Sequence, residues 1–339
     1  MTEAGAGQAG PAISVIVVTE GVSDCLRWML ECLRRQTAAS QIECVLVSRS
    51  REAFASIEAD AGPLHSLRIL ERKKGTEVMG AAKAAGVLAA TAPFVAFAED
   101  HSYPDARWAE SLLDVHREGL YAAVGPVVQN ANPVNAQSWG CFLVYYGMYM
   151  TAGAAGEAPH LPGNHSSYPR EVLLELGPRL PEVLESEIAL HGEMISRGKR
   201  LHQEPRAIVY HLNYSAIGPA VREYFLGSRV FASERSRSWG LVRRLLYACG
   251  TPLVPLIRLP RILRQARDAR LGWRIVVPVI FPALVILCAG AAGEMLGYSL
   301  GPGAAKRGLA EFELEHAHLF SATDLAAVAM RQTGNRSRG

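Results

Sequence analysis

The feature that most constrains the fold is an alternation, in the first half of the chain, between short apolar β-branched runs and helical patterns. Residues 13–18 (ISVIVV) are continuously apolar, which is typical of a strand buried on both faces of a parallel sheet. Residues 23–36 place apolar side chains at i, i+3, i+4 and i+7 after a Ser or Asp cap. Further strands are predicted at 42–47, 67–70, 94–97 and 121–128. This order predicts a doubly wound, Rossmann-like α/β fold, mostly parallel, that binds its ligand at the carboxyl ends of the strands.

A different composition follows in the last third, where the charge becomes strongly positive. The whole chain carries a net charge of +3, but the segment from Arg222 to Arg274 holds twelve Arg and three acids, so it carries +9 and the remainder −6. Hydrophobic residues make up 49% of the chain, which rules out general disorder and allows a sizeable core. Such asymmetry predicts contact with an anionic surface, either a membrane or nucleic acid.

The cysteines and the N-terminus bear on the compartment. Six scattered cysteines form no C-x-x-C pair and several lie in apolar runs, which predicts free thiols in a reducing compartment. The first ten residues lack the basic and apolar regions of a secretory signal, so we expect the catalytic part to stay in the cytosol.

The richest candidate chemistry follows the strand at 94–97. The segment FVAFAEDHSYPDARW runs from that strand directly into Glu99, Asp100 and His101. Carboxylate and imidazole ligands at the carboxyl end of a central strand suit a divalent Mn or Mg ion, which neutralises a diphosphate. The alternative is an acidic loop that caps the next helix.

This segment resembles the D-x-D region of family 2 glycosyltransferases with the GT-A fold, with Glu99 and His101 at the two Asp positions. The last motif of the same family has a His at the position of His211 in this chain. The resemblance covers about residues 12–214. It implies a nucleotide-sugar donor and a divalent metal, Mn or Mg, held by Glu99, His101 and His211.

The resemblance also implies residues that contact the donor. The strand ending in Val18-Thr19-Glu20-Gly21, the following Gln36-Thr37 and the strand IECVLVSRS are similar to the nucleotide-binding start of the family, with Ser48 at the position of its base-contacting Asp. The stretch GAAKAAG places Lys83 at the position of a phosphate-binding Arg, and a basic residue in YFLGSRVFASER offers a second cation. The donor-contacting residues expected in this way are Thr19, Glu20, Ser48, Lys83, Asp100 and Arg229. For Lys83 a solvated helix position is the alternative.

The acceptor side is implied by two later motifs. The stretch LPGNHSSYPR resembles the acceptor loop of the family, which implies that Gly163, Asn164 and His165 contact the acceptor. Glu185-Ser186-Glu187 stands at the family's E-D motif, which implies Glu187 as the general base, with Glu185 as the fallback. Two surface acids at a helix cap are the alternative.

The basic segment and the apolar run that follows it predict contact with a membrane. Nineteen uncharged residues at 275–293 approach the roughly 20 that a spanning helix needs, and Pro278 and Pro282 allow a kinked span, a re-entrant hairpin or an in-plane helix. From Arg258 onward, apolar residues lie on one helical arc and arginines on the other. This pattern predicts an interfacial helix bound to anionic lipids, and the apolar runs beside it disfavour nucleic acid.

These observations predict four parts: a disordered N-terminus (1–11), a GT-A domain (12–215), a membrane-associated helical module (216–300) and a partly disordered tail (301–339). We expect an inverting glycosyltransferase at the cytoplasmic face of the membrane, monotopic or single-span, that acts on a polysaccharide precursor or lipid-linked acceptor. The rival hypothesis is a degenerate, non-catalytic scaffold or binding subunit. A nucleotidyl transferase fits the acceptor loop and the late His poorly.

Overall fold

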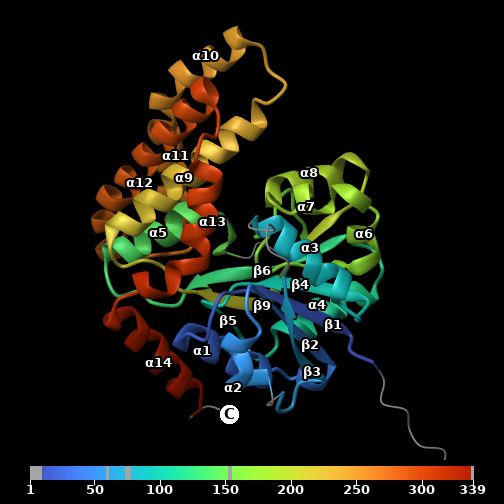
Figure 1. Ribbon diagram of the computed structural model, residues 1–339. Helices are drawn as coiled ribbons and strands as arrows, with labels where there is room; N and C mark the ends of the chain where they lie inside the picture. Colours follow the sequence, from blue (N-terminus) through green and yellow to red (C-terminus); the bar gives the residue numbers. More distant parts are fainter. Residues whose placement is uncertain (1–9, 59–60, 73–77, 152–154, 337–339) are drawn as a thin grey trace, which may run out of the picture.

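The strands of the computed structural model, which describes residues 10–58, 61–72, 78–151 and 155–336, form one mixed sheet (Figure 1). Nine strands occur in the described residues, in the order β3-β2-β1-β4-β8-β6-β9-β5, with β7 beside β9. Their bounds are β1 Ile13–Val18, β2 Ile42–Ser48, β3 Ser66–Glu71, β4 Phe94–Ala98, β5 Ser102–Pro104, β6 Ala123–Asn130, β7 Gly156–Glu157, β8 Ser167–Pro169 and β9 Leu201–His211. The predicted strands are present, and the α/β fold class is confirmed.

The long strands of the sheet run in one direction. Strands β3, β2, β1 and β4 are parallel neighbours, with Ile13 opposite both Ile42 and Phe94. Strand β8 is antiparallel to β4 and β6, and β9 is parallel to β6. Strands β1, β2, β4, β6 and β9 therefore end at the same edge of the sheet, where an α/β fold binds its ligand.

Helices cover both faces of this sheet. They are α1 Asp24–Arg34, α2 Ala55–Glu58, α3 Met79–Ala89, α4 Trp108–Arg117, α5 Ala136–Tyr146, α6 Arg170–Leu174, α7 Leu180–Val183 and α8 Glu187–Ser196. The hydroxyl of Ser23 accepts a hydrogen bond from Leu26 N (3.1 Å), so α1 has the predicted cap. The buried faces of α1 and α4 share one apolar cluster, while α3, α6, α7 and α8 share a second.

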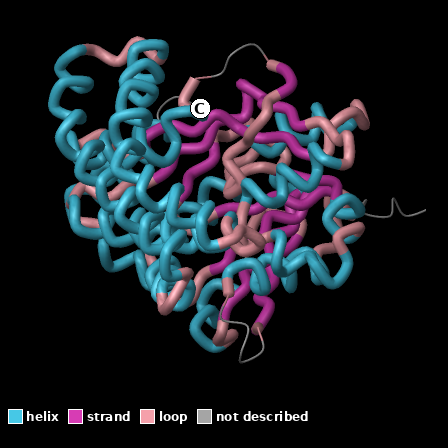
Figure 2. The backbone as a smooth tube through the Cα atoms, turned by 90° about the horizontal axis from the view of Figure 1, so that it is seen from above, coloured by secondary structure: helices cyan, strands magenta, loops and turns pink. Residues whose placement is uncertain are grey.

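The last third of the chain is helical and lies to one side of the sheet (Figures 1 and 2). Its helices are α9 Ile217–Arg235, α10 Leu241–Gly250, α11 Val254–Asp268, α12 Trp273–Leu300, α13 Ala305–Glu315 and α14 Ala322–Arg336. Gly290, Gly293 and Gly297 of α12 face α9, where a Cβ atom would meet the ring of Tyr224 and backbone carbonyls. Small residues thus allow these two helices to pack closely.

Three expectations for this region can be compared with the structure. Pro278 and Pro282 lie inside one continuous helix α12, which excludes the re-entrant hairpin and leaves the kinked span and the in-plane helix. The apolar arc of α11 faces the protein, since Ile262 and Ala266 are buried in the main core, so this arc is not available to a membrane. The tail at 301–339 contains α13 and α14, and its predicted partial disorder stays a prediction. Residues 1–9 and 337–339 lie outside the described residues.

The helical region and one face of the sheet share an apolar cluster. One cluster of buried apolar side chains runs from Leu30 of α1 through Phe142 of α5 to Ile286 of α12 and Val328 of α14. Four of the six cysteines are buried in the structure, and all six are free thiols. The charge boundary at about residue 215 is therefore not a boundary in packing.

Candidate active site

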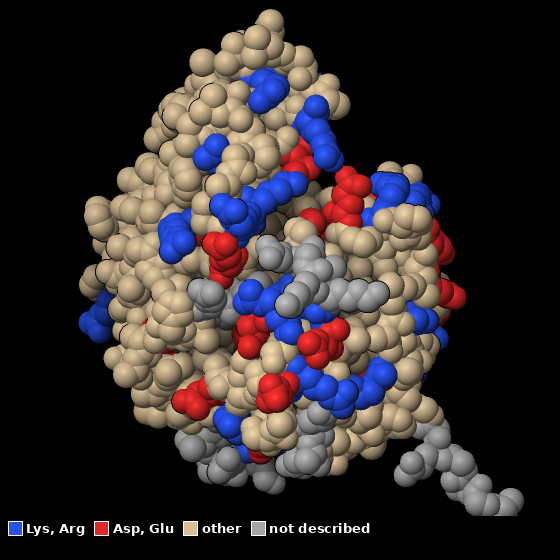
Figure 3. All heavy atoms as spheres, viewed as in Figure 1, with Lys and Arg blue, Asp and Glu red and all other residues tan. Residues whose placement is uncertain are grey.

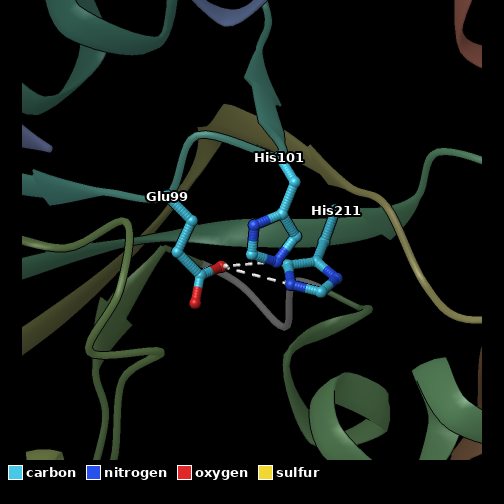
Figure 4. A group of neighbouring side chains, drawn as sticks. All are labelled: Glu99, His101 and His211. Carbon is cyan, nitrogen blue, oxygen red and sulfur yellow. Dashed lines mark ion pairs between the residues drawn. The ribbon is translucent and has the colours of Figure 1, made fainter. Parts of the chain in front are cut away.

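Three potential metal ligands meet at the carboxyl-terminal edge of the sheet (Figure 4). Glu99 directly follows β4, and His101 directly precedes β5. Strand β5 pairs with β9 so that Ser102 lies opposite His211, the last residue of β9. This pairing brings together residues 110 positions apart, and one ligand atom from each of the three lies within 4.8 Å of the others. The sequence prediction for these three positions is consistent with this geometry.

The amide of Asn213 orients the imidazole of His211. Asn213 Nδ2 donates to Asn130 Oδ1 (3.0 Å) and to the His211 carbonyl (2.8 Å), and Asn130 Oδ1 also accepts from the backbone N–H of Asn132 (3.1 Å). Asn213 Oδ1 must therefore face His211 Nδ1, at 3.1 Å. Because an amide oxygen can only accept a hydrogen bond, His211 Nδ1 carries the proton. In the neutral ring Nε2 then carries the free lone pair, and it lies 3.1 Å from Glu99 Oε2.

Asp100 holds His101 in the same way. Its Oδ1 lies 3.1 Å from His101 Nδ1, and its Oδ2 accepts a hydrogen bond from the hydroxyl of Thr19 (2.7 Å). A carboxylate beside Nδ1 fixes the proton on that nitrogen, so His101 Nε2 is directed to Glu99 Oε2, 3.8 Å away. Asp100 and Thr19, both predicted to contact the donor, thus orient the candidate metal ligand His101 in the structure.

The environment of Glu99 fits a cation. Its Oε2 and the Nε2 of the buried His165 lie 3.4 Å apart, yet neither atom has a hydrogen-bond partner among the described residues. Burial raises the pKa of Glu99, but the positive charge and N–H groups of the imidazoles of His101, His165 and His211 outweigh burial and hold this pKa well below its usual value. With neutral imidazoles that present lone pairs, a divalent ion between them and Glu99 Oε2 would supply the positive charge instead.

Asn164 connects the metal ligands to the candidate base. Its side-chain amide donates to Glu99 Oε1 (2.7 Å), its Oδ1 accepts from Lys83 Nζ (2.7 Å) and its backbone N–H donates to Glu187 Oε1 (3.1 Å). Gly163 permits this arrangement, because a Cβ atom at that position would overlap the side chain of Glu187. The residues expected to serve donor, metal and base therefore form one connected group.

Glu185 lies on the other side of this group. Its Oε1 accepts a hydrogen bond from the backbone N–H of Gly80 (2.6 Å) at the start of α3. Burial raises the pKa of Glu185, against the backbone hydrogen bond and the charge of Lys83, which lower it. Glu187, at the start of α8, follows the cap residue Ser186, whose hydroxyl accepts from Ala189 N (3.3 Å).

A cleft of about 480 Å³ opens over these residues, within the usual size of a small-molecule site. Lys83, Glu99, His101 and His211 line it from the sheet side. The helical region contributes the other wall, with Glu223, Val230, Arg258, Lys306, Leu309 and Ala310. Figure 3 shows charged side chains of both signs around the hollow between the two regions.

Other predicted donor contacts lie outside the lining of the cleft. Thr19 and Glu20 follow β1, and Ser48 is the last residue of β2 at the same edge of the sheet. Glu20 forms ion pairs with Arg49 and Arg72. Arg229 also does not line the cleft. Its Nε donates to the carbonyl of Gly301 (3.0 Å), which fixes the turn after α12, so the expectation that it faces the donor is not supported. Arg258 and Lys306 are the cations that this region contributes.

Sequence reasoning missed a polar network behind the metal ligands. Asn132 Nδ2 donates to Asp324 Oδ1 (2.6 Å), and Asn132 Oδ1 accepts from the backbone N–H of Asn213 (2.8 Å). This network joins α14 to His211 across the chain. The spacing of His211 and Asn213 was a usable signal, because alternate residues of an extended segment lie on one side. Nothing local in the sequence indicates Asp324.

Residues 14–177 match the family described as glycosyl transferase family 2, a range that contains Glu99, His101 and Asn164 and ends before Glu187 and His211. No curated protein matches the chain. Similar solved structures include GalNAc-T7 with UDP, GalNAc and Mn²⁺ (14% identity, 59% of this chain and 43% of that chain, TM-score 0.46). They also include TarS from S. aureus (14%, 86% and 55%, TM-score 0.45). A third is the mannosyltransferase PcManGT from Pyrobaculum calidifontis with GDP-Man and Mn²⁺ (16%, 96% and 88%, TM-score 0.43). This chain spans less than two thirds of the length of the GalNAc-T7 chain and of the TarS chain.

Proposed function

We propose that this chain, whose residues 14–177 match the glycosyl transferase family 2, transfers a sugar, with inversion, from a nucleotide-sugar to a hydroxyl of a glycan or lipid-linked acceptor. The observation that carries the proposal is the convergence in one cleft of Glu99, His101 and His211 with the carboxylate of Glu187. Asn164 bridges the two groups by hydrogen bonds to Glu99 and Glu187.

In this reaction Glu187 takes the proton of the acceptor hydroxyl while the hydroxyl oxygen attacks the anomeric carbon. The bond from that carbon to the phosphate oxygen breaks on the opposite face, and the nucleoside diphosphate leaves with the bonding electrons. A divalent ion held by Glu99, His101 and His211 supplies charge neutralisation for this leaving group. The backbone N–H of Asn164 keeps the Glu187 carboxylate oriented, and Lys83 donates to the side-chain oxygen of the same Asn164.

The base assignment is tested by replacing Glu187 with Gln, which keeps size and removes the proton acceptor. A panel of UDP- and GDP-sugars with Mn²⁺ supplies the donor, and release of nucleoside diphosphate is measured. We expect Glu187→Gln to lower kcat about 10²- to 10⁴-fold with donor binding retained. Glu185→Gln is the matched control, with a smaller loss of activity. Full activity of Glu187→Gln would remove the assignment.

The rival hypothesis of a non-catalytic scaffold predicts another outcome of the same panel. If no nucleotide-sugar is bound or consumed with any divalent ion, a scaffold is favoured over an enzyme. Binding without turnover, in the presence of acceptor lipids and glycans, would indicate a binding subunit.

We further propose that the helical region rests on the cytoplasmic face of a membrane. Helix α12, with 28 residues, is the one described helix long and apolar enough to cross a bilayer. One side of it is occupied by the protein, because Pro282 and Ala283 pack on Gly140 of α5. Large apolar side chains remain exposed on its other side and on α10 and α11: Leu241, Val242, Leu245, Leu246, Leu256, Ile257, Trp273, Val277 and Phe281. This surface, with arginines on the same helices, suits a monotopic contact with anionic lipids.

A further inference from the structure

His165, which the sequence predicts to contact the acceptor, directs its side chain toward the candidate metal ligands. His165 is buried and its Nε2 lies 3.4 Å from Glu99 Oε2. The ring of His165 also lies 6.1 Å, between centroids, from that of His211. Glu99 Oε2 is thus faced by three imidazole nitrogens, those of His211, His165 and His101, at 3.1, 3.4 and 3.8 Å.

These separations match the spacing of ligands around one ion. Ligand atoms bound about 2.1 Å from a common metal lie about 3.0 to 3.4 Å apart in octahedral and tetrahedral sites. Of the three separations from Glu99 Oε2, two fall in this range and the third needs a small closure. Glu99, His101 and His211 form the group whose ligand atoms lie within 4.8 Å of one another, so His165 must move toward His101 and His211 to share one ion with them. The buried Glu99 Oε2 and His165 Nε2 are also left without hydrogen bonds by the rest of the described protein. Both observations point to an atom between them.

The backbone at His165 supports the same conclusion. His165 has φ +122°, in the left-handed region that a residue with a side chain rarely adopts. Consecutive side chains in an extended segment point to opposite sides. At this loop, however, Asn164 contacts Glu99 Oε1 and the adjacent His165 contacts Glu99 Oε2. Strain of this kind is retained where a site requires it.

We propose that His165 is a metal ligand, so that the ion is held by three imidazoles and one carboxylate from His101, His165, His211 and Glu99. A set with three nitrogen ligands favours first-row transition ions, since Mg²⁺ prefers oxygen ligands and water. The site therefore selects ions such as Mn²⁺, Co²⁺ or Zn²⁺ over Mg²⁺. This inference concerns the metal that the proposed function requires, but metal binding is measured without sugar transfer.

The test is a titration of the full-length metal-free protein with Co²⁺, whose visible spectrum reports the number and type of ligands. We expect binding that excess Mg²⁺ does not displace. His165→Gln is expected to weaken Co²⁺ binding about 10- to 100-fold or more and to change the visible bands. His160→Gln, an exposed position near the start of the same loop, is the matched control and should leave both unchanged.

A second variant separates ligation from a structural role. His165→Cys restores a ligand atom, so it should recover Co²⁺ affinity and add a sulfur-to-cobalt charge-transfer band. An unchanged spectrum and affinity in His165→Gln, or a His165→Cys protein that is folded without this band, would overturn the assignment. Displacement of Co²⁺ by Mg²⁺ at similar concentration would overturn the stated preference. If the unaltered protein binds Co²⁺ as expected but transfers no sugar, the result counts against the proposed function and not against this inference.

Discussion

The sheet domain and the helical region differ in how they use apolar and charged residues. In residues 12–215 the apolar side chains are largely buried, and acids and histidines gather at one edge of the sheet. In residues 216–336 large apolar side chains remain exposed on α10, α11 and α12, and arginines follow the same helices. Yet the two regions share one apolar cluster and both line the cleft. A difference in surface chemistry therefore does not mark an independent folding unit.

Removal of the helical region is expected to have the largest effect on the sheet domain. A protein that ends after residue 215 loses the partners of Phe142 in α5 and of the other core side chains that face α11, α12 and α14. We expect it to be insoluble or to show no cooperative thermal transition, because a large apolar surface is exposed. Soluble expression and a thermal melt by circular dichroism measure this. A folded, monomeric truncated protein would show that the sheet domain stands alone.

The next largest effect concerns the buried contact between α14 and the sheet domain. Asp324 accepts hydrogen bonds from Asn132 Nδ2 (2.6 Å) and Ser215 Oγ (2.7 Å), and from the backbone N–H of Ser321 (2.9 Å). Asp324→Ala leaves these donors unsatisfied, so we expect a loss of about 3 kcal/mol in the free energy of unfolding, measured in urea. Asn132 is hydrogen-bonded to Asn213, which orients His211. We therefore expect Asp324→Ala to lower the metal affinity as well.

The matched control for this prediction is Asp268→Ala. Asp268 is exposed at the end of α11 beside Arg267, and an exposed pair contributes little. If both variants lose the same stability, the buried network does not join the two regions as described.

Much of this arrangement could be predicted from sequence, for identifiable reasons. The apolar runs that became β1, β2 and β4 and the periodicity of α1 carry strong local signals. The strand 94–98 also predicts where Glu99 lies, because it fixes the edge of the sheet. His211 was assigned through a resemblance, and its approach to His101 depends on the short strand β5, whose three residues have no periodicity to detect.

Other features escaped prediction because they depend on tertiary contacts. The sequence predicts the apolar arc of α11. Whether such an arc packs on protein or on lipid depends on the tertiary structure, and Ile262 and Ala266 pack on protein. The turn that directs His165 to Glu99 rests on an unusual φ at a residue that carries a side chain. The role of Asp324 depends on Asn132, almost two hundred positions away.

A smaller effect tests the exposed surface of the helical region. Leu246 of α10 and Leu256 of α11 are each 67% exposed. The double variant Leu246→Glu/Leu256→Glu should reduce cosedimentation with vesicles rich in phosphatidylglycerol by about tenfold or more, since burial of a leucine stabilises by about 1.5–3 kcal/mol. Leu88→Glu, 64% exposed on α3 of the sheet domain, is the control. Equal binding by all three proteins would exclude this surface as the membrane contact.

The smallest expected effect is on acid stability, and it arises in the sheet domain. Burial lowers the pKa of His116 and of His191 from 6.5 to about 4 in the folded protein. The unfolded chain therefore binds more protons between pH 6.5 and 4, and stability falls as pH falls through this window. At pH 5.5 each histidine is expected to cost about 1 kcal/mol. Urea midpoints of His116→Gln and His191→Gln, compared between pH 7 and 5.5, should drop less than those of the unaltered protein.

The cleft between the two regions is proposed to bind a metal ion and a nucleoside diphosphate together. The most direct measurement is the Tm of the full-length protein with UDP or GDP, with and without Mn²⁺. We predict that one nucleotide raises the Tm by about 2–5 °C only when Mn²⁺ is present, and that Glu99→Gln removes this rise. No rise with either nucleotide, or a rise that is unchanged in Glu99→Gln, would contradict the account.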